Sequence, residues 1–171
     1  MKSVKTYDNS ISWDIKEIEK LKWKFIKTYC INPAFKTYVN KRYKNVIGND
    51  AYFLPNDMPK FVNKILQLSF LKKYKIKSPG FHRFRPGMIL PLHIDSYNAF
   101  SKMYDINDKE KINRYIFFLE NSKLGHMIQV NDKIYNKWNA GDFLKWNGST
   151  PHAAFNLGIE NRYTLQITCY E

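Results

Sequence analysis

The sequence is poor in several residue types, and each shortage narrows what the protein can be. Its 171 residues include two cysteines, Cys30 and Cys169, which are too few and too far apart for a disulfide framework or a CxxC motif. Two reduced thiols in a reducing compartment are the simplest interpretation. No apolar run approaches the roughly 20 residues that span a bilayer, and residues 1–13 have no long apolar core that would indicate a signal peptide. We therefore expect a cytoplasmic protein without membrane contact.

Arginine is scarce as well, although the net charge is +13. Of the 28 basic residues five are arginine, so 23 (28 minus 5) are lysines, and they are spread along the chain. This lysine content, with 17 asparagines, is typical of proteins from AT-rich genomes, phage genomes among them. A solvated lysine surface is therefore favoured over a dedicated phosphate-binding face, although binding to nucleic acid at low salt is expected of any chain this basic.

The first part of the chain reads as helical. Ser12 or Asp14 is suited to cap a helix over about residues 15–29, whose apolar positions share one face, and Asn32-Pro33 ends it. A second helix is expected from Pro59, a favoured first-turn residue, to about Lys73. Residues 34–56 are expected to be mixed and loop-like.

From Gly80 onward, short apolar or aromatic runs alternate with turn-forming residues, which predicts about eight strands in a sandwich or barrel. The polar stretch 96–112 is expected to be a loop that covers substrate or has no role. Helices first and strands second indicate an α+β fold in which the helices buttress one sheet. No linker is visible, so we expect one domain over 1–171, with a helical part (1–79) and a strand-rich core (80–171). The apolar or aromatic runs that predict the strands are 81–85, 88–93, 114–119, 126–130, 134–138, 143–146, 152–156 and 163–169.

Histidine and carboxylate side chains carry the first sign of chemistry. In His93-Ile94-Asp95 the outer two residues are two apart, so in an extended chain they project to the same side. His152 would complete a set of two histidines and one carboxylate, which leaves coordination positions open and suits non-haem Fe(II) oxygenases. Alone, the HxD pattern is weak, because a His–Asp hydrogen bond at a strand end is the more common arrangement.

The context of this pattern is an ordered series of motifs. Arg83-Phe84-Arg85-Pro86-Gly87 precedes HxD, and an aromatic strand led by Arg114 follows it. A Gly141-Asp142 turn, the distal His152 and an arginine ten positions later complete the series. Over roughly residues 81–170 the sequence therefore resembles the 2-oxoglutarate/Fe(II)-dependent oxygenases, near their prolyl hydroxylase and aspartyl/asparaginyl β-hydroxylase branches.

The resemblance implies a fold, cofactors and a site. The fold would be a double-stranded β-helix, a cupin-like jelly roll, with the two ligand-bearing strands side by side and the arginine strand on the facing sheet. His93, Asp95 and His152 would bind Fe(II), and Arg162 would bind the distal carboxylate of the cosubstrate 2-oxoglutarate, with Thr164 donating a hydroxyl to it. O₂ would be the oxidant.

Asp95 separates branches of this superfamily. Related halogenases lack the carboxylate so that chloride can bind iron, so its presence implies hydroxylation or a demethylation that proceeds through it. The β-hydroxylase branch often omits the carboxylate, and the chain departs from that branch here.

Three further side chains are candidates for contact with substrate. Arg114 would lie near the pocket according to the resemblance, and a salt bridge at a strand end is an equally supported alternative. Trp146 is expected in the barrel core or at the pocket mouth, and Tyr97 just beyond Asp95 is a further candidate. His82 and His126, as lone histidines, are expected to be surface or hydrogen-bonded residues. Arg83 and Arg85 are expected to keep an edge strand soluble, with an acidic substrate as the alternative.

Three functions remain open on the sequence. The favoured one is hydroxylation of an amino-acid side chain, free or within a peptide or protein. The second is a nucleic-acid oxygenase that removes alkyl groups, which the charge would suit, but the further arginine that this branch usually carries after the last-strand arginine is missing. The third is a non-catalytic jelly-roll binding module, which would need neither the ligand set nor Arg162.

Overall fold

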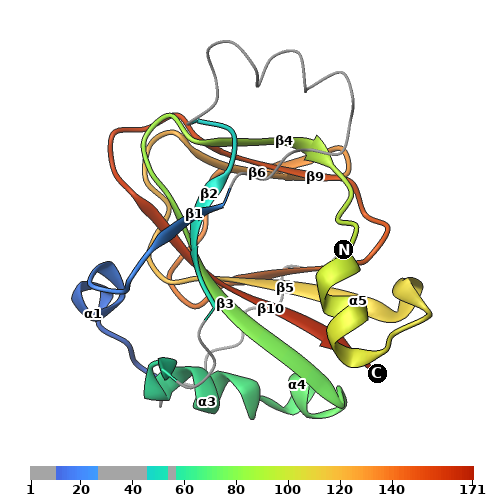
Figure 1. Ribbon diagram of the computed structural model, residues 1–171. Coiled ribbons are helices and arrows are strands. Elements are labelled where there is room, and N and C mark those ends of the chain that lie inside the picture. The colour runs from blue at the N-terminus through green and yellow to red at the C-terminus, as the bar shows by residue number, and fades with distance from the viewer. Residues whose placement is uncertain (1–10, 27–45, 54–56) are drawn as a thin grey trace.

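The computed structural model describes residues 11–26, 46–53 and 57–171. Two sheets face each other, and every pair of neighbouring strands in them is antiparallel (Figure 1). The larger sheet has the order β1 (Lys24–Ile26), β2 (Asn49–Tyr52), β3 (Ile76–Phe84), β10 (Arg162–Tyr170), β5 (Ile112–Phe118), β8 (Phe143–Asn147). The smaller sheet has the order β4 (Ile89–His93), β9 (His152–Asn156), β6 (His126–Val130), β7 (Lys133–Tyr135).

This arrangement is the double-stranded β-helix, or jelly roll, expected from the sequence. The strands β9 and β10 follow one another in the chain, yet β9 pairs with β4 and β6 in one sheet while β10 pairs with β3 and β5 in the other. The chain therefore crosses between sheets instead of forming a local hairpin. This crossing separates His152 from Arg162 and sets them on opposing walls.

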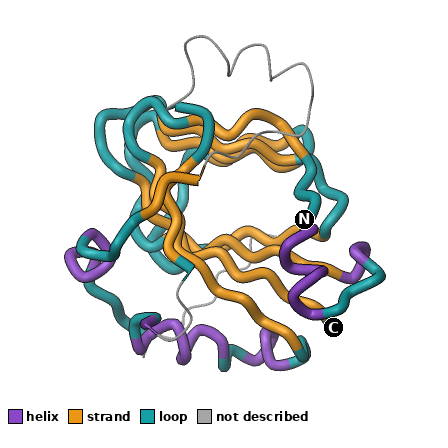
Figure 2. Tube along the Cα trace, in the orientation of Figure 1, coloured by secondary structure: helices purple, strands orange, loops and turns teal. Residues whose placement is uncertain are grey.

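Short helices cover the outer face of the larger sheet (Figure 2). They are α1 (Ile15–Glu19), α3 (Lys60–Leu66) and α4 (Ser69–Lys72). Their buried residues, such as Ile18, Val62 and Leu71, form one apolar cluster with Leu165 and Ile167 of β10. The fold is therefore α+β with the helices buttressing one sheet. No helix in the described ranges has the length and apolarity needed to cross a membrane.

Strand periodicity divides the larger sheet into two faces. Tyr115 and Phe117 of β5 point to the helices, whereas Ile116 and Phe118 point to the smaller sheet and belong to a second apolar cluster. That second cluster lies between the sheets and also contains Ile128 of β6. The interior of the roll is thus lined by every other residue of each strand.

The helices in the structure are shorter than those that the sequence pattern predicts. The first ends at Glu19, and the chain then forms β1, while residues 27–29 of the expected helix lie outside the described ranges. The second is split between α3 and α4, because Leu68 is extended (φ −57°, ψ 139°). This break lets Phe70 stack on Phe143, with ring centroids 4.9 Å apart.

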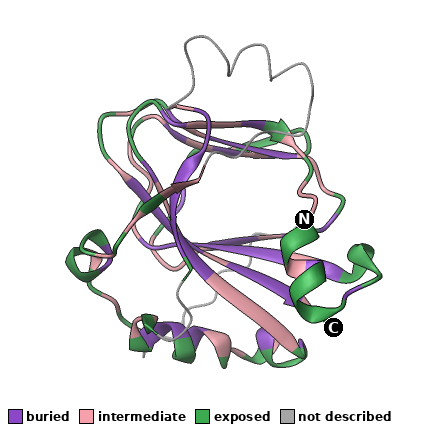
Figure 3. Ribbon diagram, in the orientation of Figure 1, coloured by how far each residue is buried: buried purple, intermediate pink, exposed green. Residues whose placement is uncertain are grey.

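The boundary expected at residue 80 is also wrong. β3 begins at Ile76, and its first residues pair with the end of β10 up to Tyr170. β2, within a stretch expected to be loop, pairs with β3 and extends the same sheet, and the rest of that stretch outside 46–53 is not described. The expected loop over 96–112 contains the largely exposed helix α5 (Asn98–Tyr104) and the 3₁₀ turn Lys109–Lys111 (Figure 3).

Arg83 and Arg85 have a structural role that the sequence did not indicate. β3 is flanked by β2 and β10, so it is not an edge strand. Both guanidinium groups pair with the buried carboxylate of Asp50 on β2, at 2.7 Å for Arg83 and 3.0 Å for Arg85. The two arginines therefore hold β2 against β3 from the face opposite the interior.

Candidate functional site

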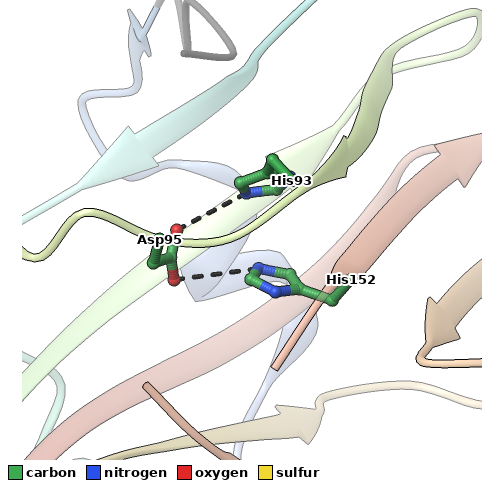
Figure 4. A group of neighbouring side chains, drawn as sticks. All are labelled: His93, Asp95 and His152. Atoms are coloured by element: carbon green, nitrogen blue, oxygen red, sulfur yellow. Dashed lines mark ion pairs between the residues drawn. The ribbon is translucent and has the colours of Figure 1, made fainter. Parts of the chain in front are cut away.

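Two histidines and one aspartate converge at the facing ends of β4 and β9 (Figure 4). His93 is the last residue of β4 and His152 the first of β9, and the two are partners across the antiparallel ladder. Asp95 lies two residues beyond His93. The ligand atoms of the three side chains lie within 4.8 Å of one another. The Asp95 oxygens are 3.4 Å from Nε2 of His93 and 3.7 Å from Nε2 of His152.

Backbone carbonyls orient both imidazole rings. Nδ1 of His93 lies 2.7 Å from the carbonyl oxygen of Pro91, and Nδ1 of His152 lies 3.0 Å from that of Thr150. A carbonyl can only accept, so Nδ1 carries the hydrogen in each ring and Nε2 presents a lone pair. Nε2 of His93 is buried without a hydrogen-bond partner. This pattern, with the outer ring nitrogen held by an acceptor, is the one that metal-binding histidines show.

The protonation states also suit a metal. Burial lowers the pKa of His152 to about 4, so its ring is neutral at physiological pH. Burial alone would raise the pKa of Asp95, but the Arg114 guanidinium and the two imidazoles outweigh burial and hold this pKa well below its usual range. A neutral imidazole and an ionised carboxylate are the forms in which these side chains bind a divalent cation.

Arg114 is the closest charged partner of Asp95. Its Nη2 lies 2.7 Å from Oδ2 of Asp95, and its guanidinium lies 5.0 Å from the centre of the Tyr97 ring. Of the two roles expected for Arg114, the salt bridge is therefore observed, and it is made to a member of the His-Asp-His group. The pair fixes the rotation of the carboxylate and leaves Oδ1 as the oxygen nearer to His93.

A cavity of about 110 Å³ adjoins this group between the sheets. A water molecule needs roughly 10–15 Å³ on the same measure, so the space fits a small molecule. Two larger hollows, of about 350 and 610 Å³, have neither histidine nor arginine in their linings, so only the smaller of these three cavities borders the His-Asp-His group. Besides the three converging residues, its polar lining consists of Asn49, His82, Arg114, Trp146, Arg162, Thr164 and Gln166.

Arg162 enters this cavity from the larger sheet. It is 1% exposed, and its guanidinium lies 4.2 Å from the centre of the Phe84 ring. Nη1 donates to the carbonyl oxygens of Met127 (2.7 Å) and Phe155 (3.0 Å), while Nε has no partner. Burial lowers the pKa of Arg162 to about 9, and within the described ranges no carboxylate lies within ion-pair distance. A buried cation without a counter-ion is costly and indicates an anionic ligand.

The other expected site residues fall into two groups. Thr164 lies two residues along β10 from Arg162 and lines the cavity, as does Trp146, whose ring centre is 4.8 Å from that of His152. Tyr97 does not belong to the lining. It is buried in a left-handed backbone conformation (φ 52°), where it supports Arg114. Its link to the site is therefore through Arg114 and Asp95.

Two cavity residues, His82 and Asn49, were not recognised as such from the sequence. His82 is hydrogen-bonded, as expected, since its Nδ1 lies 2.7 Å from Nδ2 of Asn49, but its place in the lining was missed, and Asn49 was not considered. The available signal was that His82 alternates with Phe84 on one strand, but the inward face of that strand depends on its pairing with β10. His126 is hydrogen-bonded, as expected: its Nε2 lies 3.2 Å from the carbonyl oxygen of Glu160.

The low pKa of His82 predicts a loss of stability in mild acid. Burial, with help from Arg114 and Arg162, lowers the pKa of His82 from 6.5 to about 3. As the pH falls below about 6.5 the unfolded chain takes up a proton that the folded protein refuses, so the free energy of unfolding falls. At pH 5 the loss attributable to His82 is about 2 kcal/mol. Urea unfolding of the metal-free protein between pH 7 and 5 measures it. The variant His82→Gln should show a correspondingly flatter profile, and an unchanged profile would contradict the assignment.

Solved structures of other proteins resemble this chain in fold. A prolyl-4-hydroxylase from Pseudomonas putida superposes with a TM-score of 0.53 at 13% identity, covering 72% of each chain. A cupin domain from Schizosaccharomyces pombe gives 0.45 at 8% identity, covering 72% of this chain and 65% of the other. The first match shows the shared fold. Among curated proteins, none matches this sequence.

The sequence also matches a family model over most of its length. The model describes aspartyl/asparaginyl β-hydroxylases and matches residues 40–171, a range that includes the strands of the roll from β2 onward and all the cavity residues. This chain therefore belongs to the aspartyl/asparaginyl β-hydroxylase family.

Proposed function

We propose that the chain is a hydroxylase that depends on Fe(II) and 2-oxoglutarate and acts on an amino-acid side chain, free or within a peptide or protein. One observation carries the proposal. Two imidazoles and a carboxylate converge beside a cavity into which a buried arginine projects from the facing sheet, and no carboxylate of the described ranges pairs with this arginine. Membership of a hydroxylase family supports the same reaction class.

The donor set fits iron. Two neutral imidazole nitrogens and one carboxylate form the set typical of non-haem Fe(II) oxygenases, which leaves positions open for other ligands. Nε2 of His93 is buried and has no hydrogen-bond partner among the described residues, and a metal bound between it and Asp95 would satisfy it. When bound, Fe(II) would supply the redox chemistry by which O₂ and 2-oxoglutarate give succinate and CO₂ while one oxygen atom enters a C–H bond of the substrate.

Protein groups would bind and orient the cosubstrate. Arg162 presents a planar guanidinium, which can meet the distal carboxylate with two hydrogen bonds and stays charged in a dry site. Thr164 adds a hydroxyl from the same face of β10. The apolar walls, which include Phe84, Ile116 and Ile128, would exclude water around these charges and so strengthen their interaction.

Trp146 is the candidate for contact with the substrate. Trp146 lies beside His152, and we expect its ring to contact the substrate. Arg114 is held by Asp95, so we assign it to the metal site instead. No feature of the lining favours a nucleobase, so the net charge of +13 remains the only argument for the nucleic-acid oxygenase.

Formation of succinate tests the proposal. Protein loaded with Fe(II) under argon is exposed to O₂ and 2-oxoglutarate with panels of amino acids, peptides and alkylated oligonucleotides. We expect succinate to form faster with at least one amino acid or peptide. Stimulation by alkylated oligonucleotides alone would favour the alternative oxygenase. If succinate never exceeds the level of a metal-free control, the chain acts as a binding module and the proposal fails.

Arg114 gives a more specific prediction about the metal. In Arg114→Gln the Asp95 carboxylate loses its charged partner at 2.7 Å and can rotate away from the imidazoles. Loss of such a supporting partner weakens metal binding by about 10- to 100-fold. Competition with a fluorescent chelator under argon measures the Kd for Fe(II).

Arg85→Gln is the matched control, because Arg85 also pairs with a buried carboxylate, that of Asp50, on the opposite face of β3. It should leave the Kd unchanged. Equal metal affinities for Arg114→Gln and the unaltered protein would show that the salt bridge does not hold the carboxylate in place for the metal.

A further inference from the structure

The cavity contains a histidine that belongs neither to the proposed metal site nor to the proposed cosubstrate site at Arg162 and Thr164. His82 projects into it from β3, and in the register of the sheet it is the partner of Thr164 on β10, two residues from Arg162. Its Nδ1 lies 2.7 Å from the Nδ2 atom of Asn49. Its Nε2 is buried and has no hydrogen-bond partner among the residues that the structure describes.

The bonds of Asn49 determine which nitrogen of His82 carries the hydrogen. Nδ2 of Asn49 also lies 3.0 Å from the carbonyl oxygen of Asp50, a group that can only accept, so this atom is the amide nitrogen. The amide nitrogen donates its other hydrogen to Nδ1 of His82, which must therefore be bare. In a neutral ring the hydrogen is then on Nε2, the atom in the cavity.

The ring is neutral. Burial lowers the pKa of His82 to about 3, and the nearby Arg114 and Arg162 add to this effect, while Asp95 opposes it. His82 therefore offers one N–H donor and no charge. A buried donor without an acceptor costs about 1–3 kcal/mol, so its persistence between two guanidinium groups indicates that a ligand oxygen satisfies it.

We propose that the Nε2–H of His82 donates to the distal carboxylate of the bound dicarboxylate, as a third donor beside Arg162 and Thr164, and so selects 2-oxo acids that carry this carboxylate. The assignment rests on the proposed function, since that function supplies the dicarboxylate. Asn49 is a positioning residue, because it acts by fixing the ring tautomer.

Binding of two 2-oxo acids tests this role. Calorimetry under argon on the Fe(II)-loaded protein measures the Kd for 2-oxoglutarate and for 2-oxobutanoate, which lacks the distal carboxylate. His82→Phe keeps an aromatic ring but removes the donor, and it should raise the Kd for 2-oxoglutarate by about 10- to 100-fold. The Kd for 2-oxobutanoate should change by less than about threefold. His82→Gln restores an N–H donor and should recover most of the affinity.

The results separate this proposal from the one on which it rests. If the unaltered protein binds Fe(II) but not 2-oxoglutarate, the proposed function fails, and the role of His82 fails with it. If it binds 2-oxoglutarate and His82→Phe weakens both acids equally or neither, only the role of His82 is overturned. Fe(II) stoichiometry, measured on each variant, should stay at one per chain and so shows that the fold and metal site are intact.

Discussion

Replacing His152 with alanine is expected to abolish metal binding and turnover together. The variant removes one of two imidazoles whose Nε2 atoms point at Asp95, and the remaining pair cannot enclose a cation. Removing an outer partner of a metal ligand costs about 10- to 100-fold in affinity, so loss of a ligand itself should cost at least 100-fold. Anaerobic Fe(II) titration and succinate formation measure the two effects.

His126→Gln is the control for this variant. His126 is also buried, but it is hydrogen-bonded to the Glu160 carbonyl and does not line the cavity. It should retain one Fe(II) per chain and the activity of the unaltered protein. Retention of metal by His152→Ala, with a titration that still saturates at one per chain, would show that the imidazoles do not form the site.

Replacing Arg162 with methionine is expected to weaken 2-oxoglutarate binding by about 2–5 kcal/mol, or roughly 30- to 5,000-fold. The methionine removes the buried cation, which has no counter-ion in the described part of the chain, so the distal carboxylate would enter the cavity unpaired. Fe(II) binding should persist, because Arg162 is on β10 and the ligand set is on and beside β4 and β9. Calorimetry under argon measures the Kd for 2-oxoglutarate and the Kd for Fe(II).

Two comparisons sharpen the result for Arg162. Arg162→Lys keeps the positive charge but loses the planar guanidinium that can form two parallel hydrogen bonds. Its affinity for 2-oxoglutarate should therefore lie between that of Arg162→Met and that of the unaltered protein. The affinity for 2-oxobutanoate should hardly change in either variant, because that acid lacks the group that Arg162 would bind. An equal loss of affinity for 2-oxoglutarate and 2-oxobutanoate would instead indicate that the substitution collapses the cavity.

Much of the candidate site was predictable because its signals are local. His93 and Asp95 are two residues apart next to a strand, and strand geometry alone puts them on one side. Arg114 and Thr164 were placed near the pocket by the family resemblance, and both line the cavity. The motif series then supplied the pairing of distant strands, which no local pattern contains.

The remainder depended on tertiary contacts. His82 faces the cavity only because β3 pairs with β10 in a register that sets it opposite Thr164. The partnership of Arg114 with Asp95 joins residues from β5 and from the chain beyond β4, so it could not be read from either segment. β1 is too short to show a period, and it forms because β2 offers an edge for pairing.

A crystal structure of the protein grown under argon with Fe(II) and 2-oxoglutarate tests the central claim most directly. Anomalous scattering at the iron edge should give one strong peak between His93, Asp95 and His152, with density for the diacid running from the metal to the Arg162 guanidinium. An iron peak elsewhere, or none at full loading, would contradict the account, as would a diacid bound away from Arg162.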